Sequence, residues 1–446
     1  MIELKAGNPI TQNSTSSLQF SNQFRSDLNR SPPYSIPMED NIPNLLRQPT
    51  PTHSKRASRV DSLNDFQDDI LSQILSFLPI KDAFRTTILS KRWVSLCHSR
   101  DVHHFNDIQS GVNEIEAWIH FCQMLDAILL SPRAQQHTLK SFHLKCRYDF
   151  WQFDYSSINQ WVETAIRRHV EDLSLFLLPR VTLTSAIFCC KTLVVLKLTN
   201  LLVATLFDCS VHLPLLKTLH LSDVRFDDIE DLKKLISGSP MLEDLKTAYV
   251  TSNIGVEVTA GGYSKTLSKL IKANIRLFDV PLRAVSNVQF LTVTGMGKSL
   301  PNQEINSYYQ GCPVFENLIE LRLFWFDNCI HDWYEVVQML HNCPKLQSLS
   351  ISKWTGLSTT NEIEDWKYPY TVPECVSSHL TTCKILDYHA IEADFRFVTY
   401  ILRNARHLQV MEIHYRSTWN SMESPQFLED LFSYPRISPA CNLSFI

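Results

Sequence analysis

With 446 residues, 44% of them hydrophobic and 20% charged, the chain can bury substantial cores and is long enough for about two to four domains. Its formal net charge of -4 provides no overall field that would attract nucleic acid or anionic lipid. The sequence has no basic segment leading into an apolar run and no stretch of about 18 apolar residues, which argues against secretion and membrane spanning. We therefore expect a cytoplasmic or nuclear protein without nucleic-acid or membrane partners, whose 12 cysteines are reduced thiols.

The first 60 residues are poor in side chains that build a core. They contain seven of the 21 prolines, nine serines and three aromatic residues, and they show no helical or strand periodicity. This composition predicts a disordered N-terminal tail over residues 1–60. The small basic run at Lys55, Arg56 and Arg59 could serve as a nuclear address, but short basic runs are common in polar tails.

Three short helices are predicted directly after the tail. Apolar residues fall on one face of the first helix, at Ile70, Leu71, Ile74, Leu75 and Leu78. Asp68 and Asp69 lie in its first turn, where the helix dipole favours anions, and Pro79 prevents its continuation. A second helix is predicted over 80–88, and a third begins after Ser90, which can act as its N-cap.

A unit of about 40 residues rarely buries enough surface to be stable alone. Each apolar side chain left in water forgoes about 1.5 to 3 kcal/mol of burial. The three-helix unit therefore needs a second surface. The sequence leaves two sources open, the rest of the chain or another protein.

From residue 138 onward, short strands of the form L-x-x-L-x-L recur. Eleven segments show this pattern: 138–146, 170–177, 192–200, 216–223, 242–249, 267–274, 288–295, 318–325, 346–353, 379–388 and 408–415. Leu196, Leu219, Leu245, Leu270 and Leu291, taken as equivalent, are 23, 26, 25 and 21 residues apart. Such a period is typical of the leucine-rich repeat, and because no unit buries its own apolar face, the units must stack into a solenoid.

The segments between these strands also resemble one another. Residues 232–245, 336–349 and 398–411 each combine an amphipathic helix, a small polar turn and the next strand. Between the three-helix unit and the first repeat, we expect residues 101–137 to form a helical linker.

No motif that carries chemistry is complete. The stretch 288–302 places the tripeptide GKS after a strand, but a phosphate-binding loop also needs glycine at the position of Thr292. Histidine and cysteine residues lack the spacing of zinc sites, and no nucleophile motif occurs. Asp227 and Asp228 are most simply interpreted as solvated turn residues. We predict no catalytic residue, no metal and no cofactor.

An aromatic-rich run follows one of the later strands. Its five aromatic residues are Phe324, Trp325, Phe326, Trp333 and Tyr334. Aromatic side chains are enriched in protein-binding hot spots, although strand alternation places about half of such residues in the core. We predict that part of this cluster binds a target protein and that target contacts concentrate around 324–370. An interaction map confined to residues 138–250 would refute this prediction.

Three sequence segments together resemble a known family. Residues 61–97, DSLNDFQDDILSQILSFLPIKDAFRTTILSKRWVSLC, resemble the F-box. The stretch WVETAIRRHVEDLSL at 161–175 is similar to the entry into the repeats of a plant family with an F-box, irregular leucine-rich repeats and an FBD region. The C-terminal part of the chain resembles the FBD pattern of the same family in three segments, at 372–380, 397–413 and 433–446.

The resemblance implies an α/β fold, a short three-helix F-box followed by an irregular leucine-rich repeat solenoid with a parallel β-sheet. The implied domains are a disordered tail (1–60), the F-box (61–100), the helical linker (101–137), the leucine-rich repeats (138–365) and an FBD region that continues the solenoid (366–446).

In function, the resemblance implies the substrate-recognition subunit of an SCF-type (Skp, cullin, F-box) E3 ubiquitin ligase, a receptor that performs no catalysis itself. The F-box would bind a Skp-type adaptor, and through it a cullin, while the repeats would bind a target protein for ubiquitination. Seven residues are implied to lie at or near the adaptor surface: Phe66, Gln67, Ile70, Leu71, Ile74, Pro79 and Leu89.

Three residues depart from the family pattern, and one of them is Cys97, which stands where an aromatic residue is frequent. Gln67 replaces a proline whose preset φ suits a helix start, so adaptor binding could be weaker, and Ile80 stands where the family usually has threonine. The alternative function is a leucine-rich repeat protein-binding scaffold outside any ubiquitin ligase, with the F-box-like unit as an N-terminal cap. The sequence identifies neither the target, nor its degradation signal, nor any small molecule that bridges receptor and target.

Overall fold

The computed structural model describes residues 63–107, 114–147, 156–206, 210–252, 267–276, 280, 282–296, 312–325, 333–353, 368–388, 392–415 and 424–446. Residues 62–446 form one compact unit. The tail predicted over 1–60 lies outside the described residues.

The predicted three-helix unit is confirmed at the start of the described chain. It consists of α2 (Asp68–Phe77), α3 (Ile80–Arg85) and α4 (Lys91–His98), with the short 3-10 helices η1 (Leu63–Asp65) and η2 (Thr86–Ile88). Leu78 and Pro79 have extended ψ angles of 143° and 147°, which ends α2 where the proline forbids continuation. Ser90 occupies the N-cap of α4, but its side chain makes no capping hydrogen bond.

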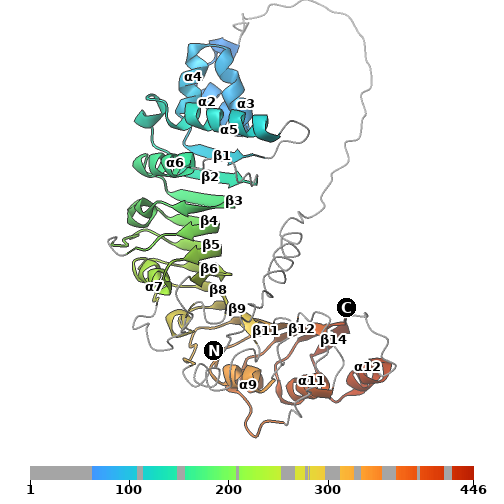
Figure 1. The fold of residues 1–446 in the computed structure, drawn as a ribbon. Helices are drawn as coiled ribbons and strands as arrows, with labels where there is room; N and C mark the ends of the chain where they lie inside the picture. Colours follow the sequence, from blue (N-terminus) through green and yellow to red (C-terminus); the bar gives the residue numbers. More distant parts are fainter. Residues whose placement is uncertain are drawn as a thin grey trace, which may run out of the picture. The chain divides into compact units, whose positions relative to one another are not determined.

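The rest of the described chain forms one parallel sheet (Figure 1). Its strands are β1 (Val102–Asn106), β2 (Ser141–Cys146), β3 (Asp172–Leu183), β4 (Val195–Val203), β5 (Thr218–Phe226), β6 (Asp244–Ala248), β7 (Thr251–Ser252), β8 (Lys272–Arg276), β9 (Phe290–Met296), β10 (Glu320–Trp325), β11 (Ser348–Lys353), β12 (Thr382–Tyr388), β13 (Val410–Tyr415) and β14 (Asn442–Phe445). They pair in chain order, except that β7 pairs with β5 and β8 follows β6. All eleven predicted strands are therefore confirmed.

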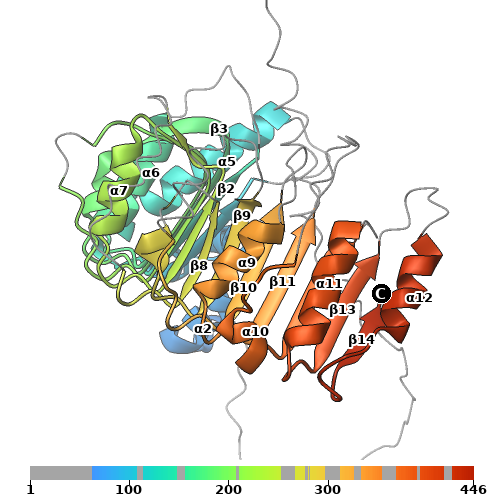
Figure 2. The same ribbon diagram turned by 90° about the horizontal axis from the view of Figure 1, so that it is seen from below.

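Return segments connect successive strands and contain helices. These are α5 (Glu114–Leu129), η3 (Ala134–Gln136), α6 (Ser156–Arg167), η4 (Ser185–Cys189), α7 (Ile229–Ser237), η5 (Leu282–Val285), α9 (Trp333–His341), α10 (Glu374–Ser378), α11 (Glu392–Asn404) and α12 (Ser424–Ser433). Figure 2 shows α6, α7, α9 and α11 along the same face of the sheet. The opposite face of the sheet is not covered by these helices, and we call it the open face.

One expectation about the start of the sheet needs correction. The segment 101–137 is not only a helical linker, because β1 lies within it and pairs in parallel with β2. The alternation of buried Phe105 with exposed neighbours is too short a signal beside the longer helical pattern of α5. Strand β14 completes the sheet beyond the last predicted repeat strand.

Inward-facing side chains of neighbouring strands stack in register to form the core. Leu196 pairs with Leu219, which pairs with Leu245, and all three are fully buried. The next partner is Ala273, so the equivalence assigned to Leu270 is wrong. Leu270 lies in the turn before β8, and because the strand position holds a small alanine, the spacing of leucines pointed to the wrong residue.

A row of bulges crosses the sheet at one level. Asn200, Asp223 and Tyr249 have φ angles of 60°, 54° and 56°, and Gly295 has 84°. Register shifts occur at this level on both sides, in β3 and between β9 and β10. Left-handed backbone conformations favour glycine, asparagine and aspartate. Asn200, Asp223 and Gly295 fit this preference, and Tyr249 is the exception.

The bulge in β3 leaves two backbone carbonyl groups without hydrogen-bond donors from the neighbouring strand, and the side chain of Asn200 donates to them instead. Its buried side-chain Nδ2 donates to the carbonyl oxygens of Leu177 and Leu178 at 2.5 and 2.6 Å, and its Oδ1 accepts from Arg180 Nε at 3.2 Å. Arg180 Nη2 also contacts Asp223 Oδ1 on the next strand at 2.8 Å. One asparagine thus links the backbone and side chains of three strands.

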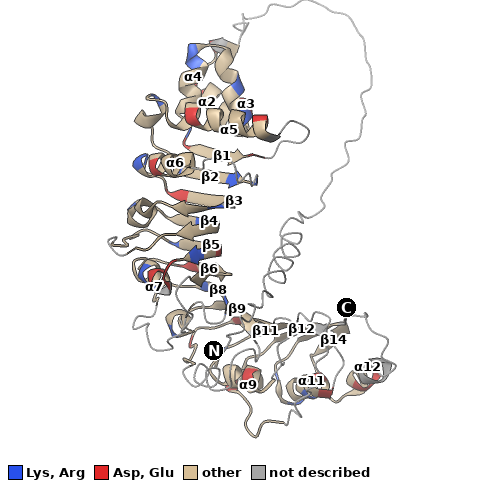
Figure 3. Ribbon diagram, in the orientation of Figure 1, with Lys and Arg blue, Asp and Glu red and all other residues tan. Residues whose placement is uncertain are grey.

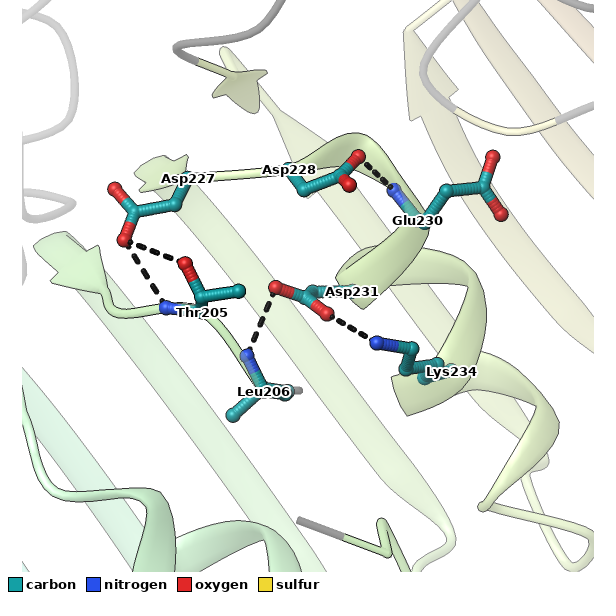
Figure 4. Close-up of polar contacts among 7 residues, drawn as sticks. All are labelled: Thr205, Leu206, Asp227, Asp228, Glu230, Asp231 and Lys234. Carbon is teal, nitrogen blue, oxygen red and sulfur yellow. Dashed lines mark hydrogen bonds and ion pairs between the residues drawn. The ribbon is translucent and has the colours of Figure 1, made fainter. Parts of the chain in front are cut away.

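Acidic residues at the start of α7 also link repeats (Figure 4). Asp227 Oδ2 accepts hydrogen bonds from the backbone N and Oγ1 of Thr205, at 3.0 and 3.1 Å. Asp231, which is fully buried, accepts from Leu206 N and pairs with Lys234, while Asp228 caps α7 through the N–H of Glu230. Asp227 and Asp228 are therefore structural acceptors, and interpreting them as solvated turn residues was wrong.

We expect Leu219→Ala to lower the free energy of unfolding by about 2 to 5 kcal/mol, because it opens a cavity between two other buried leucines. Urea denaturation of the purified chain followed by circular dichroism measures this loss. Ser222→Ala on the same strand faces the open side and should change the value by less than about 0.5 kcal/mol. Equal losses for both variants would contradict the assigned strand orientation.

Asn200 offers a test that separates backbone strain from hydrogen bonding. Asn200→Gly removes the side-chain hydrogen bonds and should cost about 1 to 3 kcal/mol of unfolding free energy. Asn200→Ala loses the same bonds and also places a Cβ at positive φ, so it should cost about 1 kcal/mol more. Urea denaturation of both variants gives the difference. An alanine variant as stable as the glycine variant would exclude the strain contribution.

Candidate functional site

The three-helix unit has a small core of its own. The six side chains of this core are Leu71, Leu75, Ala83, Trp93, Leu96 and Cys97. Burial raises the pKa of the Cys97 thiol to about 11, so this thiol stays neutral and acts as a small apolar side chain. The core is too small to account for all the apolar residues of the unit.

Two arginines hold the unit together through backbone carbonyl groups. Arg92 Nη2 donates to the Phe66 carbonyl oxygen at 2.6 Å, and its Nε contacts Asp68 Oδ1 at 2.6 Å. Arg100 donates to the carbonyl oxygens of Leu75 and Leu78 at 2.7 and 3.1 Å, at the end of α2, where carbonyl groups lack donors four residues further along. These contacts fix the position of α2 against α4.

One face of the unit packs on the end of the sheet. Ile80 is 5% exposed and belongs to the large core of the repeats, and Phe84 packs against both cores. This burial explains why an apolar residue replaces the family's usual threonine at position 80. The three-helix unit is therefore attached directly to the repeats.

Buried polar groups lie at the same junction. Burial lowers the pKa of His103 to about 3 and that of Arg168 to about 10. Arg168 Nε donates to the His137 carbonyl oxygen at 2.9 Å. His103 is consequently a neutral core histidine at physiological pH.

Away from its contact with the sheet, the unit also exposes apolar side chains. Ile70, Ile74 and Phe77 are 40%, 38% and 79% exposed, and their spacing of i, i+4 and i+7 places them on one stripe of α2. Ile88 and Leu89, after α3, are 89% and 56% exposed. We call these five residues the apolar stripe. Large exposed apolar side chains that gather on one element mark interaction sites.

The structure divides the predicted adaptor-binding residues into two groups. Ile70, Ile74 and Leu89 belong to the apolar stripe, Gln67 and Pro79 are exposed beside it, and Phe66 is half-buried. Leu71 is fully buried between the helices, so its placement at a binding surface is wrong.

Sequence reasoning also missed exposed members of this surface. Phe77 and Ile88 belong to the apolar stripe, and Leu63 is 56% exposed in η1. Phe77 follows Ile70 by seven residues, so extending the helical pattern by one turn would have found it.

The predicted target-binding aromatics are mostly core residues. Trp325 and Trp333 are 0% and 1% exposed and meet edge to face, with ring centroids 5.4 Å apart. Trp333 also stacks on Phe397 of α11 at 3.8 Å, and its Nε1 donates to Asp394 Oδ1 at 3.1 Å. These side chains join α9 to α11 and cannot contact a partner.

The other three predicted aromatics differ in position. Phe324 is half-buried on the open face of β10, and Tyr334 is 56% exposed on α9. Phe326 lies outside the described residues. A continuous aromatic surface at this place is therefore not formed by the described residues.

Two features that the described residues lack have a bearing on alternative functions. No group of three or more His, Cys, Asp or Glu side chains is arranged to hold a metal ion in this part of the chain. None of the described helices combines the length and apolarity needed to cross a membrane.

Comparisons with known proteins identify three regions. Residues 63–105 match the F-box domain, and residues 368–413 match the FBD family. Residues 158–270 match the leucine-rich repeats of FBD-associated F-box protein At5g56370. These regions follow one another in the order expected from the resemblance.

Similarity to whole proteins extends over most of the chain. FBD-associated F-box protein At3g52670 of Arabidopsis thaliana is 29% identical over 420 residues, which cover 87% of this chain and 98% of that protein. F-box/FBD/LRR-repeat protein At5g56420 of the same plant is 28% identical over 438 residues, with 86% and 99% covered. The chain thus carries matches to an F-box, to leucine-rich repeats and to an FBD region, and the proteins similar to it over most of its length are plant proteins named for these parts.

Proposed function

We propose that this protein is the substrate receptor of an SCF-type ubiquitin ligase. Its F-box binds a Skp-type adaptor, which connects it to a cullin, and its repeats hold a target protein for ubiquitination. F-box proteins are generally non-catalytic subunits of this kind, and the match to the F-box domain supports the proposal. The observation that carries it is the apolar stripe of the three-helix unit.

The two faces of the unit have different physical requirements. Ile80 and Phe84 bury their side chains against the repeats, which satisfies the inner face. The apolar stripe stays in water, where each of its side chains forgoes about 1.5 to 3 kcal/mol of burial. An adaptor that covers Ile70, Ile74 and Phe77 would recover this free energy.

The apolar stripe also separates the proposal from the alternative of a stand-alone scaffold. A unit that only capped the repeats would need the inner face with Ile80 and no exposed apolar stripe. Polar residues at positions 74, 77 and 88 would serve a cap better, because they would not favour aggregation. The exposed residues therefore favour an adaptor-binding F-box over a cap.

The receptor acts without bond chemistry of its own. It raises the effective concentration of the target near an enzyme that the assembly carries elsewhere. We propose that this occurs in the cytosol or the nucleus.

We expect Ile74→Glu combined with Phe77→Glu to weaken adaptor binding at least about 100-fold, because two apolar contacts are replaced by charges. Co-purification of the full chain with a plant Skp-type adaptor, followed by size-exclusion chromatography and calorimetry, measures the affinity. Leu71 is unsuitable for this test, since a charge in the helix core would unfold the unit.

A matched control places the same change elsewhere. Leu215 and Val314 are 52% and 50% exposed outside the F-box, so Leu215→Glu with Val314→Glu should leave adaptor binding unchanged. Circular dichroism confirms that both double variants are folded. No complex with the native chain, or equal binding by both double variants, would refute the proposal.

Gln67→Pro should strengthen adaptor binding about two- to fivefold and raise the free energy of unfolding by about 0.4 to 1 kcal/mol. Gln67 is the N-cap of α2 with a φ of -67°, which proline adopts, and none of the described hydrogen bonds uses its N–H. Calorimetry with the adaptor and urea denaturation provide the two values. A higher stability without tighter binding would place residue 67 outside the adaptor contact.

A further inference from the structure

The open face of strands β4, β5, β6 and β8 carries a group of cations. Parallel register places Lys197, His220 and Lys246 in one row across β4, β5 and β6. Lys272 lies on β8 opposite Asp244, and Arg225 lies further along β5. We call Lys197, Arg225, Lys246 and Lys272 the cationic face. Figure 3 shows blue segments on several strands of this region.

The carboxylates on these strands are already engaged. Asp244 Oδ2 lies 3.3 Å from His220 Nε2, and this neighbour together with nearby Lys272 and Lys197 lowers the pKa of Asp244. Asp223 pairs with Arg180. Within the described part of the chain, no ion pair or hydrogen bond engages the side chain of any member of the cationic face. Positive charge is thus left over on an open surface of a protein whose net charge is -4.

A small hollow adjoins this surface at the carboxyl ends of β3, β4 and β5. It has a volume of about 220 Å³ and is lined by Thr182, Leu202, Val203, Ala204, Arg225 and Asp227. The Asp227 carboxylate accepts hydrogen bonds from Thr205, as Figure 4 shows, whereas the Arg225 side chain is exposed. The hollow therefore places the exposed guanidinium group of Arg225 at the edge of the open face.

The later strands differ in charge. On β11 the open face presents the hydroxyl groups of Ser348 and Ser350, and on β10 and β12 the cations pair with carboxylates. These ion pairs join Arg322 to Glu320 and Lys384 to Glu412. The excess of positive charge is accordingly a property of the earlier repeats.

We propose that the open face of β4 to β8 binds an extended acidic segment of a partner protein. Strands lie about 4.8 Å apart, so Lys197 and Lys246, two strands apart, are separated by roughly 10 Å. In an extended peptide, side chains on one side recur about every 7 Å, which long lysine side chains can follow. On the proposed function, this partner is the target held for ubiquitination, and the proposal places its contacts on the earlier repeats instead of around 324–370, where the sequence analysis expected them.

Charge distribution favours a peptide over nucleic acid. A nucleic-acid strand carries its phosphates without interruption, and proteins that bind it usually show a wide basic surface. Here Asp244 and Asp223 lie among the cations, and the whole chain is acidic. A peptide with alternating acidic and neutral residues tolerates such interruptions.

The test uses the full chain and a fluorescein-labelled peptide of about 12 residues with alternating glutamate and serine, long enough to cross these strands. Fluorescence anisotropy measures its affinity, and a peptide with glutamine in place of glutamate serves as the reference. We expect the native chain to bind the acidic peptide at least about tenfold more tightly than the reference, with an affinity that falls as salt rises.

The decisive variant combines Lys197→Glu, Lys246→Glu and Lys272→Glu, which should weaken acidic-peptide binding at least about tenfold. The matched control combines Lys191→Glu, Arg283→Glu and Lys345→Glu. These three cations are exposed outside the strands, and their reversal changes the net charge equally. The control should alter the affinity less than about twofold, while Arg225→Ala alone should weaken binding about threefold.

Three results would overturn the inference. The first is no preference for the acidic peptide, the second is equal loss of binding in both triple variants, and the third is tighter binding of duplex DNA or phosphatidylserine vesicles than of the peptide. Adaptor binding by the same preparations keeps the two proposals distinguishable. Loss of the adaptor with intact peptide binding refutes the ubiquitin-ligase function, whereas the reverse refutes only the acidic partner.

Discussion

The structure depends on parallel pairing between strands that cannot exist alone. Each strand has an inward row of apolar side chains and two edges of backbone donors and acceptors, and only its neighbours can satisfy both. Leu196, Leu219 and Leu245 are buried because they stack on one another across three strands. The return helices cover the apolar face, so the other face remains available for polar side chains.

A stack of this kind has ends that need protection, and the F-box covers the first of them. Ile80 joins the core of the repeats, so the F-box and the sheet form one body instead of two domains on a linker. The apolar stripe stays exposed in this arrangement. An adaptor bound there would hold a fixed position relative to the open face, which suits a receptor that must present its target to a distant enzyme.

Aromatic and charged residues are divided between the two faces of the sheet, because the return helices cover only one of them. Trp325 and Trp333 fill the wide space between the sheet and α11, where bulk is needed for packing. Recognition is then left to polar side chains on the open face, where Lys197 and Lys246 stand beside carboxylates that are already paired. Partner selection by charge is expected from such a surface.

Periodicity in the sequence by itself determined the eleven repeat strands, the three F-box helices and the return helices α7, α9 and α11, because each local pattern matches the burial of its element. Tertiary structure decided which side chains are inside. Ile70 and Leu71 are both apolar and adjacent, yet only packing against α4 buries Leu71. Trp333 is buried by Phe397, which is distant in sequence. Lys197, Lys246 and Lys272 form one face only because parallel register aligns residues far apart in the chain, and no local pattern contains that information.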